Sequence, residues 1–127
     1  MATKNLLIVV AMAAEAAPTI SRLSLSPSPF PVPSLPYLLY KGSHRDATIT
    51  LVTLGQSKFG VDNVGTLHAG IALSHLLGGP DKYSAVLNCG TCGGFKARGC
   101  EIGTVVVPSS SGFHDRRIVI PGTPFEE

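Results

Sequence analysis

Two stretches of the chain place reactive or ligand-binding groups directly after an apolar run. Glu15 follows the run Asn5–Ala11, and the glycine-containing turn Asn88–Phe95 follows the run Tyr83–Leu87. In open α/β sheets, ligands bind in the crevice at the carboxyl ends of the strands. A carboxylate there can bind a hydroxyl group or activate a water molecule as a general base. The alternative is that Glu15 is a first-turn residue favoured by the helix dipole.

The turn Asn88–Phe95 contains Gly90, Gly93 and Gly94. Glycine reaches positive φ and lets a backbone approach a ligand, so the turn is expected to present free N–H groups to a ligand. Its spacing matches neither a dinucleotide-binding fingerprint nor a P-loop. A nucleotide pyrophosphate is therefore not indicated, and a sugar, a base or a single phosphate remain open.

The pair Cys89 and Cys92 forms a C-x-x-C motif. In redox sites this motif opens a helix that activates the thiolate, whereas here two glycines follow it. A zinc site would need two further ligands, and Cys100 and His114 form no recognised pattern with the pair. The favoured interpretation is small side chains around a tight turn, with no bound metal.

A second charged cluster, His114–Arg117, can form a catalytic dyad or an anion clamp. We favour a role at the surface or at a subunit interface, because such clusters are often structural. His68 and His75 have no carboxylate pattern beside them and are also interpreted as structural. No Gly-x-Ser-x-Gly elbow supports a serine nucleophile.

Apolar runs predict the strands of an α/β sheet. Asn5–Ala11 is continuously apolar, as expected of a central strand rather than a signal peptide. Pro36–Lys41 and Ala47–Leu54 predict an antiparallel hairpin, in which Thr48 and Thr50 mark a less buried face. Further strands are predicted at Tyr83–Leu87, which is expected to be buried, Gly103–Pro108 and Phe113–Ile120.

Two helices are predicted between these strands. The first begins close to Glu15 or Pro18 and ends near Leu23. The second begins with Asp62, whose carboxylate is expected to cap it, and ends before Gly78. Its expected apolar stripe consists of Val64, Leu67 and Ile71.

Residues Ser24–Pro36 contain five prolines and predict an exposed Pro/Ser-rich surface loop without regular structure. A role as a ligand for SH3 domains is the less favoured alternative.

Composition limits the classes of protein that this chain can represent. The length of 127 residues suits one domain or part of one, and 44% hydrophobic with 14% charged residues is typical of a globular protein. A net charge of +2 without a dense basic stripe gives no indication of nucleic-acid binding. No run approaches the ~18 apolar residues of a membrane span. Three cysteines cannot form a closed disulfide framework, so a reducing, cytoplasmic location is expected.

Four blocks in order give the chain a family resemblance. They resemble the plant-type 5′-methylthioadenosine nucleosidases of the nucleoside phosphorylase/hydrolase superfamily over about Leu7 to Pro121. The Pro-rich loop and Leu67–Gly79 match poorly. The blocks are Val10–Ala16, Val61–Thr66, Asn88–Lys96 and Phe113–Ile118.

The resemblance implies a three-layer α/β/α fold around a mixed sheet, usually a homodimer, without a metal or organic cofactor. The implied activity is hydrolysis of the N-glycosidic bond of 5′-methylthioadenosine, a purine nucleoside, in methionine salvage. Glu15 then matches the glutamate that helps to activate the attacking water, and Met12 lies beside it in the pocket. Thr91, Cys92 and Gly93 match the turn that lines the nucleoside site.

The family's second half carries a Met-Glu pair that holds the ribose hydroxyls and a Ser/Thr-Gly-Asp motif whose aspartate protonates the leaving adenine. Neither motif occurs in these 127 residues. The chain is therefore expected to be the N-terminal portion of a single phosphorylase-like domain, incomplete at its C-terminus. Loss of the acid alone would lower the rate on the order of 10²–10⁴-fold, so its activity is expected to be impaired.

Two alternatives belong to the same superfamily. A phosphorylase would use phosphate in place of water, for which Thr66 and Arg45 are weak candidates. A nucleoside-binding or storage-type member would keep the fold without the chemistry. Apolar faces left uncovered in a partial domain would also favour association or poor solubility.

Overall fold

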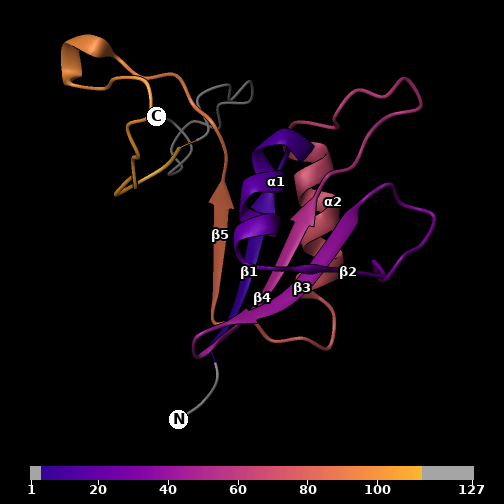
Figure 1. Ribbon diagram of the computed structural model, residues 1–127. Helices are drawn as coiled ribbons and strands as arrows, with labels where there is room; N and C mark the ends of the chain where they lie inside the picture. The colour runs from indigo at the N-terminus through magenta and orange to yellow at the C-terminus, as the bar shows by residue number, and fades with distance from the viewer. Residues whose placement is uncertain (1–3, 113–127) are drawn as a thin grey trace, which may run out of the picture. The chain divides into compact units, whose positions relative to one another are not determined.

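A computed structural model describes residues 4–112 (Figure 1). The chain divides into two compact units, Met1–Cys92 and Gly93–Glu127. The first unit holds every strand and both α-helices of the described residues, and the second contributes a short 3₁₀ turn, Lys96–Arg98. The predicted strand Phe113–Ile120 and the cluster His114–Arg117 lie outside the described residues.

The first unit is built on a five-stranded mixed sheet in the order β2-β3-β4-β1-β5. β1 pairs in parallel with both β4 and β5, whereas β3 pairs antiparallel with β2 and β4. The mixed sheet confirms the predicted fold class. The bounds are β1 Lys4–Val10, α1 Ala13–Arg22, β2 Ser26–Ser28, β3 Leu38–His44, β4 Ala47–Thr53, α2 Thr66–Leu77 and β5 Ala85–Cys89.

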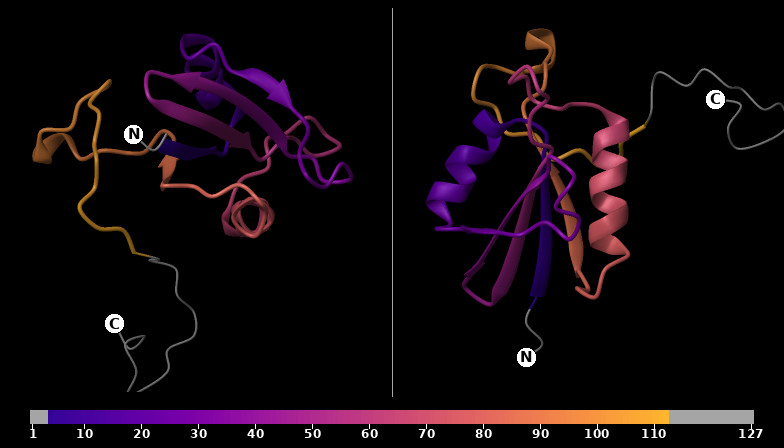
Figure 2. Two further views of the ribbon diagram at one scale, coloured as in Figure 1. Left: turned by 90° about the horizontal axis from the view of Figure 1, so that it is seen from below. Right: turned by 90° about the vertical axis from the view of Figure 1, so that its right-hand side faces the viewer.

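The two helices cover opposite faces of the sheet, which gives the predicted three layers (Figure 2). Successive side chains of a strand point to opposite faces. Accordingly, Ile8 and Val10 of β1 pack into the cluster that includes Ala16 of α1. Leu7 and Val9 pack into the cluster formed with α2. β1 is thus the covered central strand that its apolar run predicts.

The hairpin prediction is confirmed, with a longer first strand and a turn at Arg45 and Asp46, where Arg45 adopts a positive φ of 54°. The prediction of a less buried face on β4 is confirmed at Thr48, which is exposed, and wrong at Thr50. Thr50 is 2% exposed and Thr53 is 3% exposed. β4 has β1 on one side and β3 on the other, with core clusters against both faces, so Thr50 and Thr53 are enclosed regardless of their polarity.

The first helix begins earlier than predicted. α1 starts at Ala13, directly after the extended residue Met12, and Pro18 lies inside the helix. Proline lacks an N–H group, so the carbonyl four residues earlier, that of Ala14, loses its helical partner. Glu15 still lies in the first turn, where the sequence places it.

The second helix begins later than predicted. α2 starts at Thr66 after Gly65 and has no side-chain cap. The Asp62 carboxylate instead accepts a hydrogen bond of 3.2 Å from the Gln56 side chain within the preceding loop. Its predicted stripe is wrong at Val64 and Leu67, which are exposed, and confirmed at Ile71, which packs against the core. The buried residues of α2 are Ala72 and Leu76. The predicted end of the helix at Gly78 is confirmed.

The Pro-rich segment is more ordered than the sequence predicts. Ser26–Ser28 forms the edge strand β2 against β3, and Leu25 and Phe30 are buried at 6% and 7% exposure. An edge strand tolerates proline because only one of its sides needs hydrogen-bond donors. The interpretation of Ser24–Pro36 as a surface loop without regular structure is therefore wrong for β2 and for these two side chains.

Two further strand predictions need correction. The predicted Tyr83–Leu87 strand exists as β5, shifted to Ala85–Cys89, but all its residues are exposed rather than buried. It pairs only with β1 among the described residues. The segment Gly103–Pro108 forms no strand, and Val105 and Val107 are 89% and 90% exposed. Apolar composition alone does not make a strand where no neighbour supplies hydrogen bonds.

Within residues 4–112, no helix is long and apolar enough to cross a membrane.

Candidate functional site

The carboxyl ends of three parallel strands meet at one edge of the sheet. In the register of the ladders, Val10 of β1 lies beside Thr53 of β4 and beside Cys89 of β5. The segments that follow these strands therefore leave the sheet at the same level. This edge is where α/β folds bind ligands. It carries the first turn of α1 on one side and the turn after β5 on the other.

Glu15 and Thr91 meet at this edge although 76 residues separate them in the sequence. The backbone N–H of Thr91 donates a hydrogen bond of 2.7 Å to Oε1 of Glu15. The Thr91 hydroxyl donates a second bond of 2.5 Å to the same oxygen. The structure thus brings together the carboxylate and the glycine-containing turn that the sequence singles out, through a specific two-bond contact.

Gly90 lies beside the Glu15 carboxylate, where a β-carbon would be in ordinary van der Waals contact with it. A β-carbon at Gly90 would lie 3.4 Å from Oε2 and 3.5 Å from Oε1 of Glu15. Positive φ is not the reason for the glycines of this turn, because Gly90, Gly93 and Gly94 do not adopt it. That part of the sequence-based expectation is wrong. At Gly94 the reason is space, since a β-carbon would lie 2.7 Å from Cβ of Cys100.

The surroundings of Glu15 favour its charged form. The Thr91 hydroxyl lowers the pKa of Glu15 below its ordinary value, and the Thr91 backbone N–H lowers it further. Partial desolvation opposes these effects, and the Met12 backbone adds a smaller lowering. Hydrogen bonds to a carboxylate stabilise its ionised form. Glu15 is therefore held as a carboxylate that can accept a proton or orient a hydroxyl group.

The other residues proposed for the site have different surroundings. Met12 is half-buried at the N-cap of α1, where its carbonyl accepts the Ala16 N–H at 3.1 Å. Cys92 is exposed and directly follows Thr91. Gly93 begins the second compact unit and has open space around the position of a side chain. Ligand binding by these three residues stays a prediction.

The cysteines form no disulfide or metal centre in the described part of the chain. Cys89 and Cys92 are exposed free thiols, and Cys100 is a half-buried free thiol. Within residues 4–112, no group of three His, Cys, Asp or Glu side chains gathers to hold a metal ion.

The two histidines of α2 make structural contacts, as their sequence context indicates. Nδ1 of His68 lies 3.4 Å from the Tyr37 hydroxyl. The ring of His75 packs edge-on against Phe30, with 6.2 Å between ring centroids. Both rings therefore fasten the segment after β2 to α2, and neither is part of the Glu15 contact.

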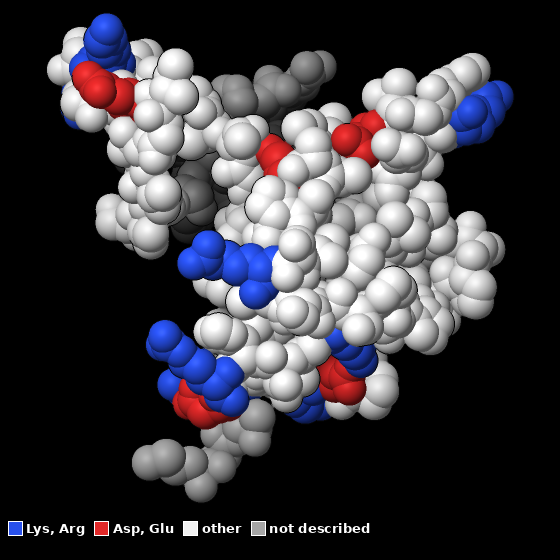
Figure 3. Space-filling model, viewed as in Figure 1, with Lys and Arg blue, Asp and Glu red and all other residues white. Residues whose placement is uncertain are grey.

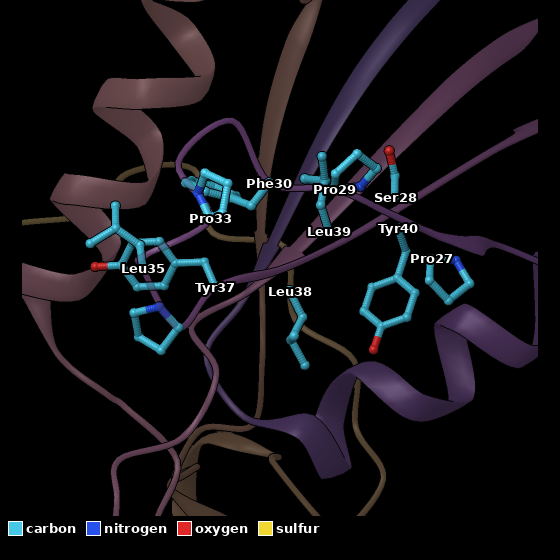
Figure 4. Close-up of a pocket in the computed structure, with 11 residues that line it drawn as sticks. Pro27, Ser28, Pro29, Phe30, Pro33, Leu35, Tyr37, Leu38, Leu39 and Tyr40 are labelled. Carbon is cyan, nitrogen blue, oxygen red and sulfur yellow. The ribbon is translucent and has the colours of Figure 1, made fainter.

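Sequence reasoning missed a hollow of about 420 Å³ beside β3 (Figure 4). Prolines, leucines and three aromatic rings line it, and Ser28 adds the only small hydroxyl of the set. A cluster of prolines beside aromatic residues is the available sequence signal, but the expectation of a structureless loop obscured it. The lining residues are Pro27, Ser28, Pro29, Phe30, Pro33, Leu35, Pro36, Tyr37, Leu38, Leu39 and Tyr40.

Comparison with known proteins gives a family match over almost the whole chain. The sequence pattern of the Phosphorylase superfamily matches residues 5–126. The chain is 40% identical over 121 residues to a 5′-methylthioadenosine nucleosidase of Arabidopsis thaliana. It is 41% identical over 123 residues to a 5′-methylthioadenosine/S-adenosylhomocysteine nucleosidase of the same organism. Each match covers 92% of this chain, and 45% and 47% of the respective relative.

The solved structure of Arabidopsis thaliana 5′-methylthioadenosine nucleosidase in its apo form has a similar fold. It superposes with a TM-score of 0.86 at 38% sequence identity, covering 96% of this chain and 51% of the other. The chain therefore spans about half the length of the relatives that it matches.

Proposed function

We propose a nucleosidase function from one premise: this chain belongs to the phosphorylase superfamily. The proposed reaction is hydrolysis of the N-glycosidic bond of 5′-methylthioadenosine, with Glu15 as the group that activates water. The names of the two similar Arabidopsis proteins support the substrate class. The observation that carries the proposal is the Glu15 carboxylate held by two Thr91 hydrogen bonds at the carboxyl ends of three parallel strands.

The chemistry follows from the charge on Glu15. As the bond between the sugar C1′ and the base nitrogen breaks, positive charge develops at C1′. A water molecule held by the carboxylate attacks C1′, and the carboxylate accepts its proton. The bonding electrons leave with the purine, which must take up a proton. The proposal assigns no residue of this chain to that acid, and it requires no metal or cofactor.

Charge distribution is compatible with a small neutral substrate. Figure 3 shows Lys, Arg, Asp and Glu in small groups of both signs, separated by uncharged surface. A nucleic-acid partner would be matched by a dense basic stripe, and the face shown carries none. Methylthioadenosine carries no phosphate, so recognition can depend on hydrogen bonds and apolar contacts.

The test is release of adenine from 5′-methylthioadenosine by the purified chain. Glu15→Gln should lower the rate on the order of 10²–10⁴-fold, because the amide cannot accept the proton. Glu101→Gln is the matched control, since the same change at an exposed residue of the second unit should leave the rate unchanged. Equal rates for Glu15→Gln and the unaltered chain would contradict the assignment of Glu15.

Two alternatives are outcomes of the same assay. Release that requires inorganic phosphate would indicate a phosphorylase. Arg45 does not support a phosphorylase, because it lies in the turn before β4, at the opposite end of the strands from Glu15. Calorimetric binding of methylthioadenosine, with release no faster than that of Glu15→Gln, would indicate a nucleoside-binding member. Parallel assays with S-adenosylhomocysteine would define the range of substrates.

The proposal extends to the protein's surroundings: a homodimer, in the cytoplasm, acting in methionine salvage. Exposed apolar side chains between β4 and the start of α2 support an association surface, namely Phe59, Val61, Val64 and Leu67. Light scattering of the purified chain should give twice the monomer mass. A monomer at micromolar concentration would contradict the dimer, and a fluorescent fusion found outside the cytoplasm would contradict the location.

A further inference from the structure

We propose that Thr91 is a positioning residue that sets both the charge and the orientation of Glu15. The inference rests on the proposed role of Glu15, but its evidence is the geometry of the contact alone. Two donors of one residue, a backbone N–H at 2.7 Å and a hydroxyl at 2.5 Å, converge on one carboxylate oxygen. Hydrogen bonds to an ionised group are shorter and stronger than neutral ones, and these distances are in that range.

The contact distinguishes the two oxygens of Glu15. Oε1 accepts both Thr91 bonds, and no other side chain among residues 4–112 donates a hydrogen bond to the carboxylate. Oε2 is therefore the oxygen available to a water molecule or a sugar hydroxyl. Gly90 adds no side chain beside Oε2, and a β-carbon there would lie in van der Waals contact with that oxygen at 3.4 Å. Thr91 thus gives the carboxylate one anchored oxygen and one oxygen that can bind water or a hydroxyl group.

The hydroxyl has a separate effect from the N–H. Every non-proline residue supplies a backbone N–H, so the first bond does not require threonine. The hydroxyl is what this side chain adds, and it makes the largest contribution to the lowered pKa of Glu15. Threonine and serine can both supply the bond, whereas valine has the same shape as threonine without a donor. The identity of residue 91 therefore controls how firmly Glu15 stays ionised.

The position of Thr91 depends on the β1–β5 ladder. Thr91 lies two residues after Cys89, the last residue of β5, and Cys89 pairs with Val10 of β1. Glu15 lies five residues after Val10, in the first turn of α1. Parallel pairing of the two strands therefore places the donor and the acceptor side by side. A shift of the ladder by one residue would move both Thr91 donors away from the carboxylate.

The test is a pH titration of the Glu15 side-chain carboxyl by carbon NMR, with Glu15→Gln used to assign the signal. Thr91→Val should raise the pKa of Glu15, and Thr91→Ser should leave it close to that of the unaltered chain. Thr48→Val is the matched control, because Thr48 is exposed on β4 and makes no contact with Glu15. Equal Glu15 titrations in Thr91→Val and the unaltered chain would overturn the proposal.

A second measurement needs no substitution. In the unaltered chain, the amide proton of Thr91 should shift with the same midpoint as the Glu15 carboxyl, since it is bonded to that group. A Thr91 amide signal that does not follow Glu15 would overturn the proposal even if Thr91→Val fails to fold. These titrations are independent of adenine release. A coupled titration supports the role of Thr91 whether or not the chain releases adenine.

Discussion

β1 and β5 are neighbouring parallel strands, yet they are held in the fold by different forces. β1 is covered on both faces, with Leu7 fully buried and Val10 2% exposed. β5 is exposed along its whole length, and Leu87 retains 44% of its accessible surface. β1 leads into Glu15 and β5 leads into Thr91. One partner of the contact is therefore fixed by packing, whereas the other is fixed mainly by a backbone ladder.

This difference has a structural consequence for the candidate site. Burial of apolar surface stabilises the folded state in proportion to the buried area, so it stabilises β1 much more than β5. Regions with few buried contacts open locally at lower free energy than the core. We therefore expect Thr91 to separate from Glu15 at lower free energy than α1, which carries Glu15, separates from β1.

The two edge strands of the sheet also differ. β2 contains Pro27, whereas β5 contains no proline or charged residue to discourage pairing with another chain.

The largest expected effect tests the contrast between the two strands directly. Leu7→Ala should lower the free energy of unfolding by about 2–5 kcal/mol, because it removes fully buried methyl groups from the core. The same change at Leu87 should cost about 1 kcal/mol, since that side chain is half exposed. Urea denaturation of both variants measures the difference. A similar loss in both would show that β5 is packed as firmly as β1.

The second effect concerns the end of β4, the other parallel neighbour of β1. Gly55 has φ +64°, and a β-carbon there would lie 1.8 Å from the Pro36 carbonyl oxygen. Gly60 has φ +73° and no atom within 4 Å of that position. Gly60→Ala should lower the free energy of unfolding by about 1 kcal/mol, from backbone strain alone. Gly55→Ala should lower it by roughly 1–3 kcal/mol more, because of the clash with Pro36.

Thermal denaturation of the two alanine variants separates these contributions. The comparison is internal, because both glycines have positive φ and both lie in the loop that follows β4. Equal losses would mean that the chain around Pro36 yields easily, and the covered side of the sheet would then be less firmly packed than its burial indicates.

A smaller effect is expected from the polar contact between Tyr37 and His68 on the α2 face. Tyr37→Phe removes the hydroxyl that lies 3.4 Å from His68 and keeps the ring that packs against Phe30. A long hydrogen bond of this kind should contribute at most about 0.5–1 kcal/mol. Tyr37→Ala, in contrast, should cost about 3–5 kcal/mol as a large-to-small change in a buried ring. Urea denaturation of both variants shows whether packing or the polar contact holds this segment.

The smallest expected effect is the pH dependence contributed by Glu15. Its pKa in the folded chain is below the ordinary value of 4.5, so the unfolded chain binds the proton more tightly. The stabilisation is fully present above pH 4.5 and is lost as the pH falls through the folded pKa. Glu15→Gln should therefore flatten the fall in stability in that acid range, while Glu101→Gln should not. An unchanged slope in Glu15→Gln would indicate that the contact with Thr91 is broken in solution.

Local sequence signals correctly predicted the elements whose own residues strongly prefer one secondary structure, so that contacts with neighbouring elements change nothing. The continuous apolar run of β1, the turn between β3 and β4, and the stop at Gly78 are of this kind. The signals failed where the local preference was weak and packing or pairing with a neighbouring strand decided the structure. Thr50 is polar but enclosed on both faces, and Ser26–Ser28 becomes a strand only because β3 lies beside it. Apolar composition at Val105 produced no strand without such a neighbour.

The candidate site divides in the same way. The sequence by itself determined that a carboxylate follows the first strand and that a glycine-containing turn follows a later one, because apolar runs and glycines act over a few residues. Only the tertiary structure decided that Thr91 bonds to Glu15, that Gly90 lies beside the carboxylate, and that β5 is exposed. These features depend on the parallel pairing of segments about 76 residues apart, and local preferences carry no information about which distant strands pair.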